Sequence, residues 1–225
     1  NLRTGEITLK GITWMFASEA YTDSLVIYSK NYRRGYFNRF TGEAVIPEQY
    51  THAWIFSEGL AAVVKEDKVG FIDRRGEVVI DFQYPYLKDN DRRVDFVFHE
   101  GYCSMYDEEG KCGIINNKGE WVVKPQYDYI QNPLYGKRVF IQNDKYGLMD
   151  DSLHIVIPAE YRYITQTSDY AIVSRWDESR MQMSYKGEIL NPMLYDMIDR
   201  LDYSTGKYFD DGTEIMASTG LYCYT

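Results

Sequence analysis

The chain copies one stretch of its own sequence several times, and this repetition constrains its fold more than any other feature. The clearest copy is EGLAAVVKEDKVGFIDRRGEVVIDFQY, residues 58–84. Each copy contains a Gly followed by two apolar residues and an Asp or Asn, then a Gly-Glu step, an apolar run and a closing Tyr. Internal repeats of 20–50 residues are typical of proteins in which each copy forms one small unit that stacks on its neighbours. We therefore expect a tandem repeat fold.

The closing tyrosines set the period of the repeat. Tyr84 follows Tyr50 by 34 residues, and the same interval separates Tyr127 from Tyr161 and Tyr161 from Tyr195. The interval from Tyr84 to Tyr127 is 43 residues, and the nine extra residues fit best at Lys88 to Val97. The predicted single repeat domain, residues 1–225, has units at 25–55, 56–87, 98–130, 134–164 and 168–198, partial units at 1–12 and 199–225, and an insertion at 88–97.

Each unit has the pattern of short strands joined by tight turns. In the clearest copy, Leu60, Ala62 and Val64 alternate on one face of a first strand. The Asp side chain that opens the turn 73–76 can accept backbone N–H groups, and its Gly can take the left-handed conformation. We expect positive φ at Gly76 and at its counterpart Gly119. Similar reasoning about the turn 107–110 places Cys103 nearer Ile114 than Cys112.

These patterns predict an all-β fold, because helical spacing of apolar residues appears nowhere for long. We expect each unit to be a three-stranded antiparallel meander, with a short fourth piece after the closing Tyr, as at residues 127–130. The units are expected to form an open superhelical or solenoid stack. A closed β-propeller is the alternative, although a unit of 34 residues is short for a blade of roughly 40 or more.

The repeat also resembles a known family. Gly59-Leu60-Ala61-Ala62-Val63 followed by Lys68-Val69-Gly70-Phe71-Ile72-Asp73 is similar to the WG (or KWG) β-repeat, which occurs mainly in bacterial proteins. The Trp of the namesake Trp-Gly pair is replaced in every unit, by Arg, Val, Cys or Tyr. The resemblance implies a repeat scaffold, and it transfers no catalytic residues.

Two sets of residues are copied most faithfully, and a repeat must copy the positions that hold its units together. We interpret both sets as structural, with the tyrosines packed between units. The alternative is that the tyrosine rings form a ladder that binds sugar rings or a peptide. The predicted structural positions are Gly35, Gly70, Gly113, Gly147, Tyr50, Tyr84, Tyr127, Tyr161 and Tyr195.

The insertion at 88–97 holds the candidate binding residues, since insertions between repeats often carry function. These residues are Asp89, Asp91, Arg92, Arg93 and Asp95. A calcium loop is one alternative, but the Gly and distal Glu of that pattern are missing. A solvated surface loop is the other.

Charge and motifs narrow the function classes. The net charge of −9 disfavours binding to a phosphate backbone, which needs a basic face. No run approaches the ~18 apolar residues of a spanning helix. His52, His99 and His154 fall at different repeat positions, and no metal-ligand spacing, cofactor motif or nucleophile motif is present. The acidic pairs Asp150-Asp151 and Asp210-Asp211 fall at predicted turns.

We therefore predict a non-catalytic binding module that presents an extended repeat surface to a protein, peptide or glycan, without cofactor or metal. One alternative is a hydrolase acting on a glycan with carboxylates from different units, and another is a structural spacer of a larger protein. The compartment stays open between export from a bacterial cell and the cytoplasm.

Overall fold

The computed structural model describes residues 8–16, 23–87, 96–177, 179–195, 198–208 and 214–224, with side chains up to residue 191. Strands make up the regular structure of this part of the chain, and no helix occurs in it. Neighbouring strands pair antiparallel in small sheets, none of which closes on itself. The predicted all-β class and the tandem antiparallel meanders are confirmed. Within the described ranges there is accordingly no helix that could cross a membrane.

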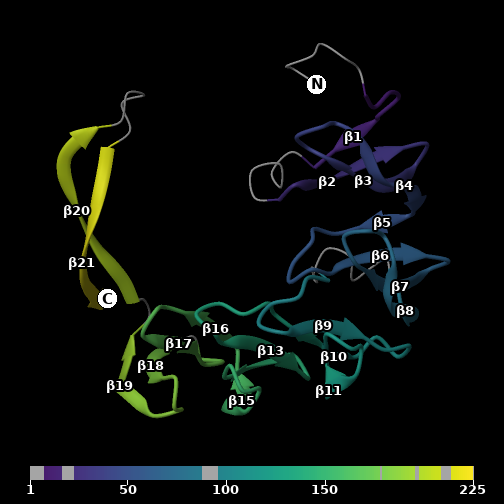
Figure 1. The fold of residues 1–225 in the computed structure, drawn as a ribbon. Helices are drawn as coiled ribbons and strands as arrows, with labels where there is room; N and C mark the ends of the chain where they lie inside the picture. Colours follow the sequence, from purple (N-terminus) through teal and green to yellow (C-terminus); the bar gives the residue numbers. More distant parts are fainter. Residues whose placement is uncertain are drawn as a thin grey trace. The chain divides into compact units, whose positions relative to one another are not determined.

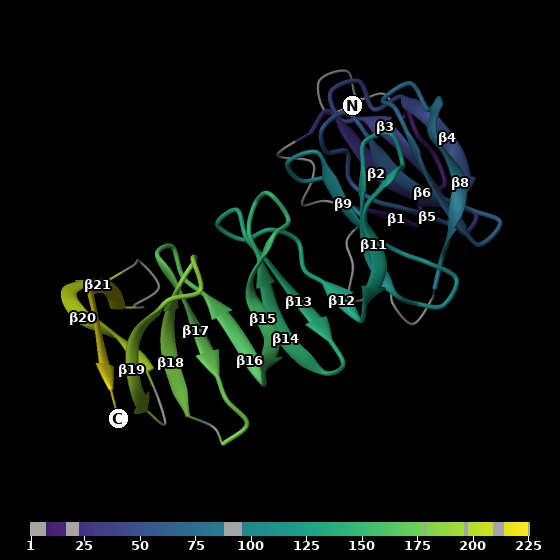
Figure 2. The same ribbon diagram turned by 90° about the horizontal axis from the view of Figure 1, so that it is seen from below.

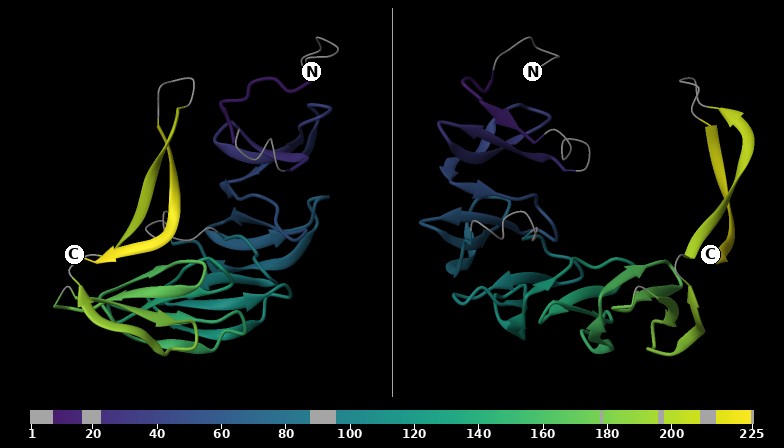
Figure 3. Two further views of the ribbon diagram at one scale, coloured as in Figure 1. Left: turned by 90° about the vertical axis from the view of Figure 1, so that its left-hand side faces the viewer. Right: turned by 180° about the vertical axis from the view of Figure 1, so that it is seen from behind.

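The chain divides into two compact units, residues 1–133 and 134–225. In the first unit, three sheets follow one another in chain order (Figures 1 and 3). The first sheet contains β1 (Trp14–Met15), β2 (Leu25–Lys30), β3 (Arg33–Asn38) and β4 (Ala44–Tyr50). The second contains β5 (His52–Ala53), β6 (Ala61–Lys65), β7 (Lys68–Ile72) and β8 (Val78–Pro85). The third contains β9 (Tyr102–Tyr106), β10 (Cys112–Asn116) and β11 (Trp121–Tyr127), and the short β12 (Tyr129–Ile130) follows it.

The second unit repeats this arrangement. One sheet contains β13 (Arg138–Gln142), β14 (Lys145–Met149) and β15 (Ile155–Tyr161). The next contains β16 (Tyr163–Gln166), β17 (Tyr170–Ser174), β18 (Arg180–Ser184) and β19 (Ile189–Tyr195), and Figure 2 shows the two sheets side by side. Last come β20 (Ile198–Tyr208) and β21 (Glu214–Tyr224), which pair as a two-stranded hairpin.

The same irregularity recurs where the last two strands of each four- or three-stranded sheet pair. In the second sheet, Val69 faces Tyr84 and Phe71 faces Ile80, so β8 advances four residues while β7 advances two. This bulge bends β8 and places the repeat Tyr opposite the residue before the repeat Gly. The corresponding pairs are Arg34 with Tyr50, Cys112 with Tyr127, Tyr146 with Tyr161 and Arg180 with Tyr195.

The bulge explains why the repeat Gly is copied. A Cβ atom added to Gly70 would lie 2.9 Å from the carbonyl oxygen of Ile80 on the bulged strand. At Gly35 the same contact, to the carbonyl of Ile46, would be 2.4 Å, and at Gly113 the carbonyl of Val123 would lie at 2.5 Å. A side chain would therefore push the bulged strand away, and only Gly allows the backbones to approach so closely.

The turns between these strands form as predicted. The Oδ1 atom of Asp73 accepts hydrogen bonds from the backbone N–H of Arg75, at 2.8 Å, and of Glu77, at 2.9 Å. Gly76 has φ of 88° and Gly119 has φ of 80°, so the expected left-handed conformation is confirmed at both. Side chains that accept in the same way are Asp107, Asn116, Asp150 and Ser184. In the first sheet, Asn38 accepts from the N–H groups of Phe40 and Thr41 instead.

The expectation that Cys103 lies nearer Ile114 than Cys112 is confirmed. Cys103 faces Ile115, the neighbour of Ile114, and Tyr106 faces Cys112. The turn between these strands is longer than the sequence indicated, because Lys111 closes it: the N–H of Asp107 donates to the Lys111 carbonyl at 3.0 Å. This register keeps the two cysteines three residue pairs apart on the ladder.

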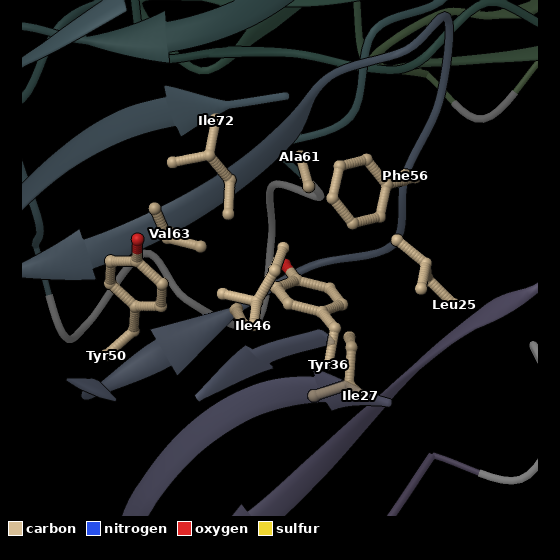
Figure 4. Close-up of a cluster of buried hydrophobic side chains, with 10 residues drawn as sticks. Leu25, Ile27, Tyr36, Ile46, Tyr50, Phe56, Ala61, Val63 and Ile72 are labelled. Atoms are coloured by element: carbon tan, nitrogen blue, oxygen red, sulfur yellow. The ribbon is translucent and has the colours of Figure 1, made fainter. Parts of the chain in front are cut away.

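Side chains from successive sheets interdigitate to form the cores. Figure 4 shows the cluster between the first two sheets, where Tyr36 and Ile46 point toward Val63 and Ile72. Each such aliphatic side chain contributes roughly 1.5–3 kcal/mol to stability by leaving water. In the second unit, a corresponding cluster joins the two sheets and contains Val139, Leu148, Ile157, Ile164, Ala171, Val173, Met181 and Met183.

Candidate interaction surface

The insertion predicted to carry binding residues is described only at its end. Asp89, Asp91, Arg92, Arg93 and Asp95 lie outside the described residues. The structure does describe the residues on either side of 88–95. Tyr86, which precedes the insertion, is 7% exposed, and Phe96, near its end, is 1% exposed. The insertion is thus flanked by buried aromatic side chains.

These two rings meet the rings of His52, on β5, and of Trp54, directly after β5. The His52 ring lies 4.5 Å from the Tyr86 ring, centroid to centroid. The Trp54 ring lies 4.9 Å from the Phe96 ring, and their planes are nearly perpendicular at 81°. This edge-to-face geometry is the favourable one for aromatic pairs. His52 and Trp54 are half-buried, so the cluster keeps part of its aromatic surface in contact with solvent.

Backbone hydrogen bonds fix this aromatic cluster in place. The N–H of Trp54 donates to the carbonyl of Ala62 at 3.0 Å, and the N–H of Tyr86 donates to the carbonyl of Asp67 at 2.9 Å. The hydroxyl of Tyr36, from the first sheet, donates to the carbonyl of Trp54 at 2.8 Å. The cluster is therefore preorganised by two sheets, which reduces the ordering that binding would require.

A polar pocket of about 380 Å³ adjoins the cluster. Thr51 lines the pocket and directly precedes His52, and its N–H and hydroxyl both donate to the Val64 carbonyl, at 2.9 and 3.2 Å. Asp67 also lines it and is the residue whose carbonyl accepts the Tyr86 N–H. The complete lining is Arg33, Gln49, Thr51, Lys65, Glu66 and Asp67. We call the aromatic cluster (His52, Trp54, Tyr86 and Phe96) together with this pocket the β5 surface.

The repeat tyrosines lie inside the sheet stack where their side chains are described. Tyr50, Tyr84 and Tyr127 are buried, and Tyr161 is half-buried. Burial raises the pKa of Tyr84 to about 12 and also raises the pKa of Tyr50, Tyr127 and Tyr161. Tyr195 belongs to β19, and its side chain lies outside the description.

The ring faces of two of these tyrosines are occupied by neighbouring sheets. The ring of Tyr50 stacks on Phe82 of β8 at 6.3 Å. The ring of Tyr84 meets Trp121 of β11 edge to face at 5.5 Å. A sugar ring or a peptide would have to displace these neighbours in order to use either tyrosine as a platform.

The candidate carboxylates have local roles where they are described. The Oδ1 atom of Asp150 accepts two backbone N–H groups of its own turn, and Asp151 is exposed beside it. Asp210 and Asp211 lie outside the described residues. Among the side chains that the structure describes, no three of the types that ligate metals gather closely enough to hold an ion.

Sequence reasoning missed the β5 surface, although one signal was available. An aromatic residue follows each of four repeat tyrosines after one intervening residue: His52, Tyr86, Tyr129 and Tyr163. In an extended segment such a residue lies on the same face as the Tyr before it. The contribution of Phe96, in contrast, depends on contact across the insertion and has no local signal.

The fold and this surface define a tandem β-repeat protein of small stacked sheets. The family model described as "WG containing repeat" matches residues 35–68, 70–91 and 113–146. These segments are therefore WG repeats, as the resemblance implied. Each match begins at a repeat Gly, which lies on a strand in the middle of a sheet, so the family's unit is offset from the sheets. No curated protein matches the chain.

Several solved structures are similar to the chain at low identity. The computationally designed Ika8 protein is 9% identical with a TM-score of 0.46, and the comparison covers 82% of this chain and 61% of Ika8. Hsv2p of Kluyveromyces lactis is 7% identical with a TM-score of 0.45, covering 73% and 59%. BamB from Moraxella catarrhalis is 14% identical with a TM-score of 0.45, covering 87% and 71%. The chain thus spans about three fifths of the length of the first two proteins.

Proposed function

We propose that the chain is a non-catalytic interaction module that binds a protein, peptide or glycan partner through the β5 surface and the insertion beside it. One observation carries the proposal. The largest departure from the repeat period begins and ends at a half-buried aromatic cluster, which has a polar pocket next to it. Insertions between repeats often lie on the binding face, and aromatic anchors surrounded by polar groups are typical of interfaces.

The parts of this surface suit different parts of a ligand. Trp54 and His52 offer flat apolar area, which can cover an aliphatic or aromatic group or the face of a sugar ring. The pocket offers the cations of Arg33 and Lys65 together with acidic and amide groups. Arg92 and Arg93 of the insertion would attract an acidic partner and make its association depend on salt.

The surroundings of three turn carboxylates support a binding function over glycan hydrolysis. A general acid needs a carboxyl whose pKa is raised toward neutrality. The backbone N–H of Glu77 instead holds the pKa of the Asp73 carboxyl below its ordinary value. Asp107 and Asp150 make the same pair of turn hydrogen bonds as Asp73. These three groups are committed to turns.

The test is a selection from a peptide-display library and a glycan array, each probed with three proteins. These are the wild type, a variant in which residues 88–95 are deleted, and Trp54→Leu. A control, Trp176→Leu, removes a Trp of the second unit that is 57% exposed. We expect ligands of the wild type to bind the control equally and both test variants at least about ten-fold more weakly, as loss of an anchor predicts. Ligands that bind all four proteins alike, or the absence of any ligand, would contradict the proposal.

A further inference from the structure

Exposed aliphatic residues recur at one repeat position, on the last strand of each sheet. In the first unit, Val45 of β4 is 42% exposed, Val79 of β8 is 50% exposed and Val122 of β11 is 45% exposed. The position before each of them is also apolar: Ala44, Val78 and Trp121. The second unit repeats the feature with Ile155 on β15 and with Ile189 and Leu190 on β19, all more than half exposed.

These residues follow one another from sheet to sheet within the first unit. The turn at Gly76 rests on β4, since a Cβ added there would lie 3.3 Å from the Ile46 side chain. The turn at Gly119 rests on β8 in the same way, 2.7 Å from the Ile80 side chain. Each of these apolar pairs, in which Trp121 is half-buried and the other five residues are exposed, is therefore followed directly by the turn and the apolar pair of the next sheet. We call Ala44, Val45, Val78, Val79, Trp121 and Val122 the outer-strand stripe; the three strands that carry it appear in Figure 2.

Core packing does not explain the stripe. Burial accounts for the neighbouring Ile46 and Ile80, which are 1% and 2% exposed, but not for Val45 or Val79. Strand propensity favours β-branched side chains, yet Thr would satisfy it equally well and would avoid exposed apolar area. A contiguous apolar surface that a repeat copies without burying it is the mark of an interaction site.

A row of acidic side chains runs beside the stripe. Glu43, Glu77 and Glu120 each precede one of these apolar pairs and are exposed themselves, and Glu188 has the same place in the second unit. The Oε2 atom of Glu120 accepts a hydrogen bond from Asn116 at 2.9 Å. This row attracts cationic groups and repels phosphate backbones and anionic membranes. It also opposes docking of a second copy stripe to stripe, which would bring like charges together.

The backbone of these strands resists the addition of a partner strand. Pro47 on β4 and Pro125 on β11 have no N–H to offer, and all three last strands carry the repeat bulge. Proline and bulges at an edge both block strand pairing. A partner must therefore be recognised through its side chains.

We propose that the outer-strand stripe binds an extended polypeptide segment in which basic and aliphatic side chains alternate at short intervals. Sheets stack roughly 10 Å apart. An extended segment in the polyproline II conformation advances about 3.1 Å per residue with three residues per turn, so every third side chain lies on the same face, and one Lys or Arg and one Val or Leu in every three residues would match the stripe. The site is distinct from the β5 surface, with which it shares no residue.

The experiment uses the full chain and three synthetic peptides of about twelve residues, a length that spans three stacked sheets. The first peptide repeats Lys-Val-Thr, the second repeats Glu-Val-Thr and the third repeats Lys-Ser-Thr. Binding is measured by titration calorimetry at physiological salt. The test protein is the double variant V79T/V122T, which keeps the β-branched shape and removes the apolar surface. A matched control is Tyr32→Thr, at a side chain that is 97% exposed on a hairpin of the first sheet.

We expect the Lys-Val-Thr peptide to bind the wild type and the control alike, at least five-fold more tightly than the other two peptides. The V79T/V122T variant should lose this preference over Lys-Ser-Thr and should keep the melting temperature of the wild type. Equal binding of both lysine peptides would reduce the interaction to unspecific charge and overturn the proposal. Absence of binding would overturn the proposal too. A wild-type dimer that the V79T/V122T substitutions dissociate would also overturn it, because the occupant of the stripe would then be a second copy of the chain.

Discussion

The hydroxyl of Tyr84 donates a hydrogen bond to the carbonyl oxygen of Gly119, 35 residues further along the chain, at an oxygen–oxygen distance of 2.5 Å. Tyr84 closes one repeat and Gly119 closes a turn of the next. The bond therefore joins two sheets through positions that both belong to the repeat pattern. It shows how a chain with short strands can hold two sheets in order: the closing Tyr of one sheet reaches the turn of the following sheet.

Removing this hydroxyl should weaken the contact between the second and third sheets. Tyr84→Phe leaves the ring in place and the Gly119 carbonyl without its partner, which should lower the free energy of unfolding by about 1–2 kcal/mol. Urea denaturation measures the change. Tyr32→Phe, at a side chain that is 97% exposed, is the control and should leave stability unchanged. Equal stability of both variants would show that the bond contributes nothing.

Substitutions at two glycines should distinguish the stability lost to left-handed backbone strain from the stability lost to a steric clash. Gly59 has φ of 85° with nothing within 4 Å of an added Cβ, whereas Gly119 has φ of 80° with Ile80 at 2.7 Å. Gly59→Ala should cost about 1 kcal/mol in stability, from backbone strain alone. Gly119→Ala should cost about 1–3 kcal/mol more, because the neighbouring strand must move. Equal melting temperatures of the two variants would contradict the close packing at Gly119.

The local part of this architecture follows from the sequence, because turns depend on a few adjacent residues. An Asp or Asn followed by Gly-Glu predicts both the hydrogen bonds of Asp73 and the positive φ of Gly76. The pairing of β5 with the sheet that follows it was harder to predict. His52 and Ala53 form a strand of only two residues, and tertiary contacts with β6, not strand propensity, decide which sheet it joins.

The β5 surface, too, could be predicted only in part from the sequence. The aromatic residue two places after four of the repeat tyrosines is visible in the sequence, but the cluster also needs Phe96, which lies near the end of the insertion. The exact partner of Cys103, which is Ile115, was not indicated by the sequence because Lys111 adds a fifth residue to the turn. Such placements depend on closing a loop between distant residues, and no local pattern encodes them.

An ion pair between Arg74 and Asp23 should make the stability of the first unit depend on pH. Arg74 donates to both carboxylate oxygens of Asp23, at 3.0 and 2.5 Å. This hydrogen bonding is the main cause that holds the pKa of Asp23 below 3.8. A lowered carboxyl pKa means that the stabilisation is complete above the unfolded value and is lost as the pH falls below 3.8 through the folded value.

Arg74→Gln should therefore lower stability by about 0.5–1 kcal/mol at pH 7, a modest amount because water screens the partly exposed pair. The difference from the wild type should shrink as the pH falls below 3.8. Urea denaturation at a series of pH values measures it. Arg75→Gln, in the same turn, is the control. A difference that stays constant down to low pH would mean that Arg74 acts only by packing on Phe56, whose ring lies 5.2 Å from its guanidinium.

The thiol of Cys112 should be inert in the folded protein. Burial raises its pKa to about 12, and its side chain is fully buried in β10. At pH 8 only about one thiol in ten thousand would be ionised, and the thiolate is the reactive form. Mass spectrometry after treatment with iodoacetamide should find Cys112 unmodified until urea unfolds the protein. Rapid modification under native conditions would show that β10 opens locally.

Changes in the scaffold and changes in the binding surface should have opposite effects on stability and binding. Deletion of residues 88–95 removes no described core side chain and shortens a connection, so it should change the free energy of unfolding by no more than about 1 kcal/mol. Tyr127→Ala removes a side chain that is 4% exposed and should cost roughly 3–5 kcal/mol. Thermal melts of the two variants, read beside their binding to a ligand selected on the wild type, compare the two roles. If the deletion unfolds the protein while Tyr127→Ala stays folded and loses binding, the repeat tyrosines form the binding site and the insertion belongs to the scaffold.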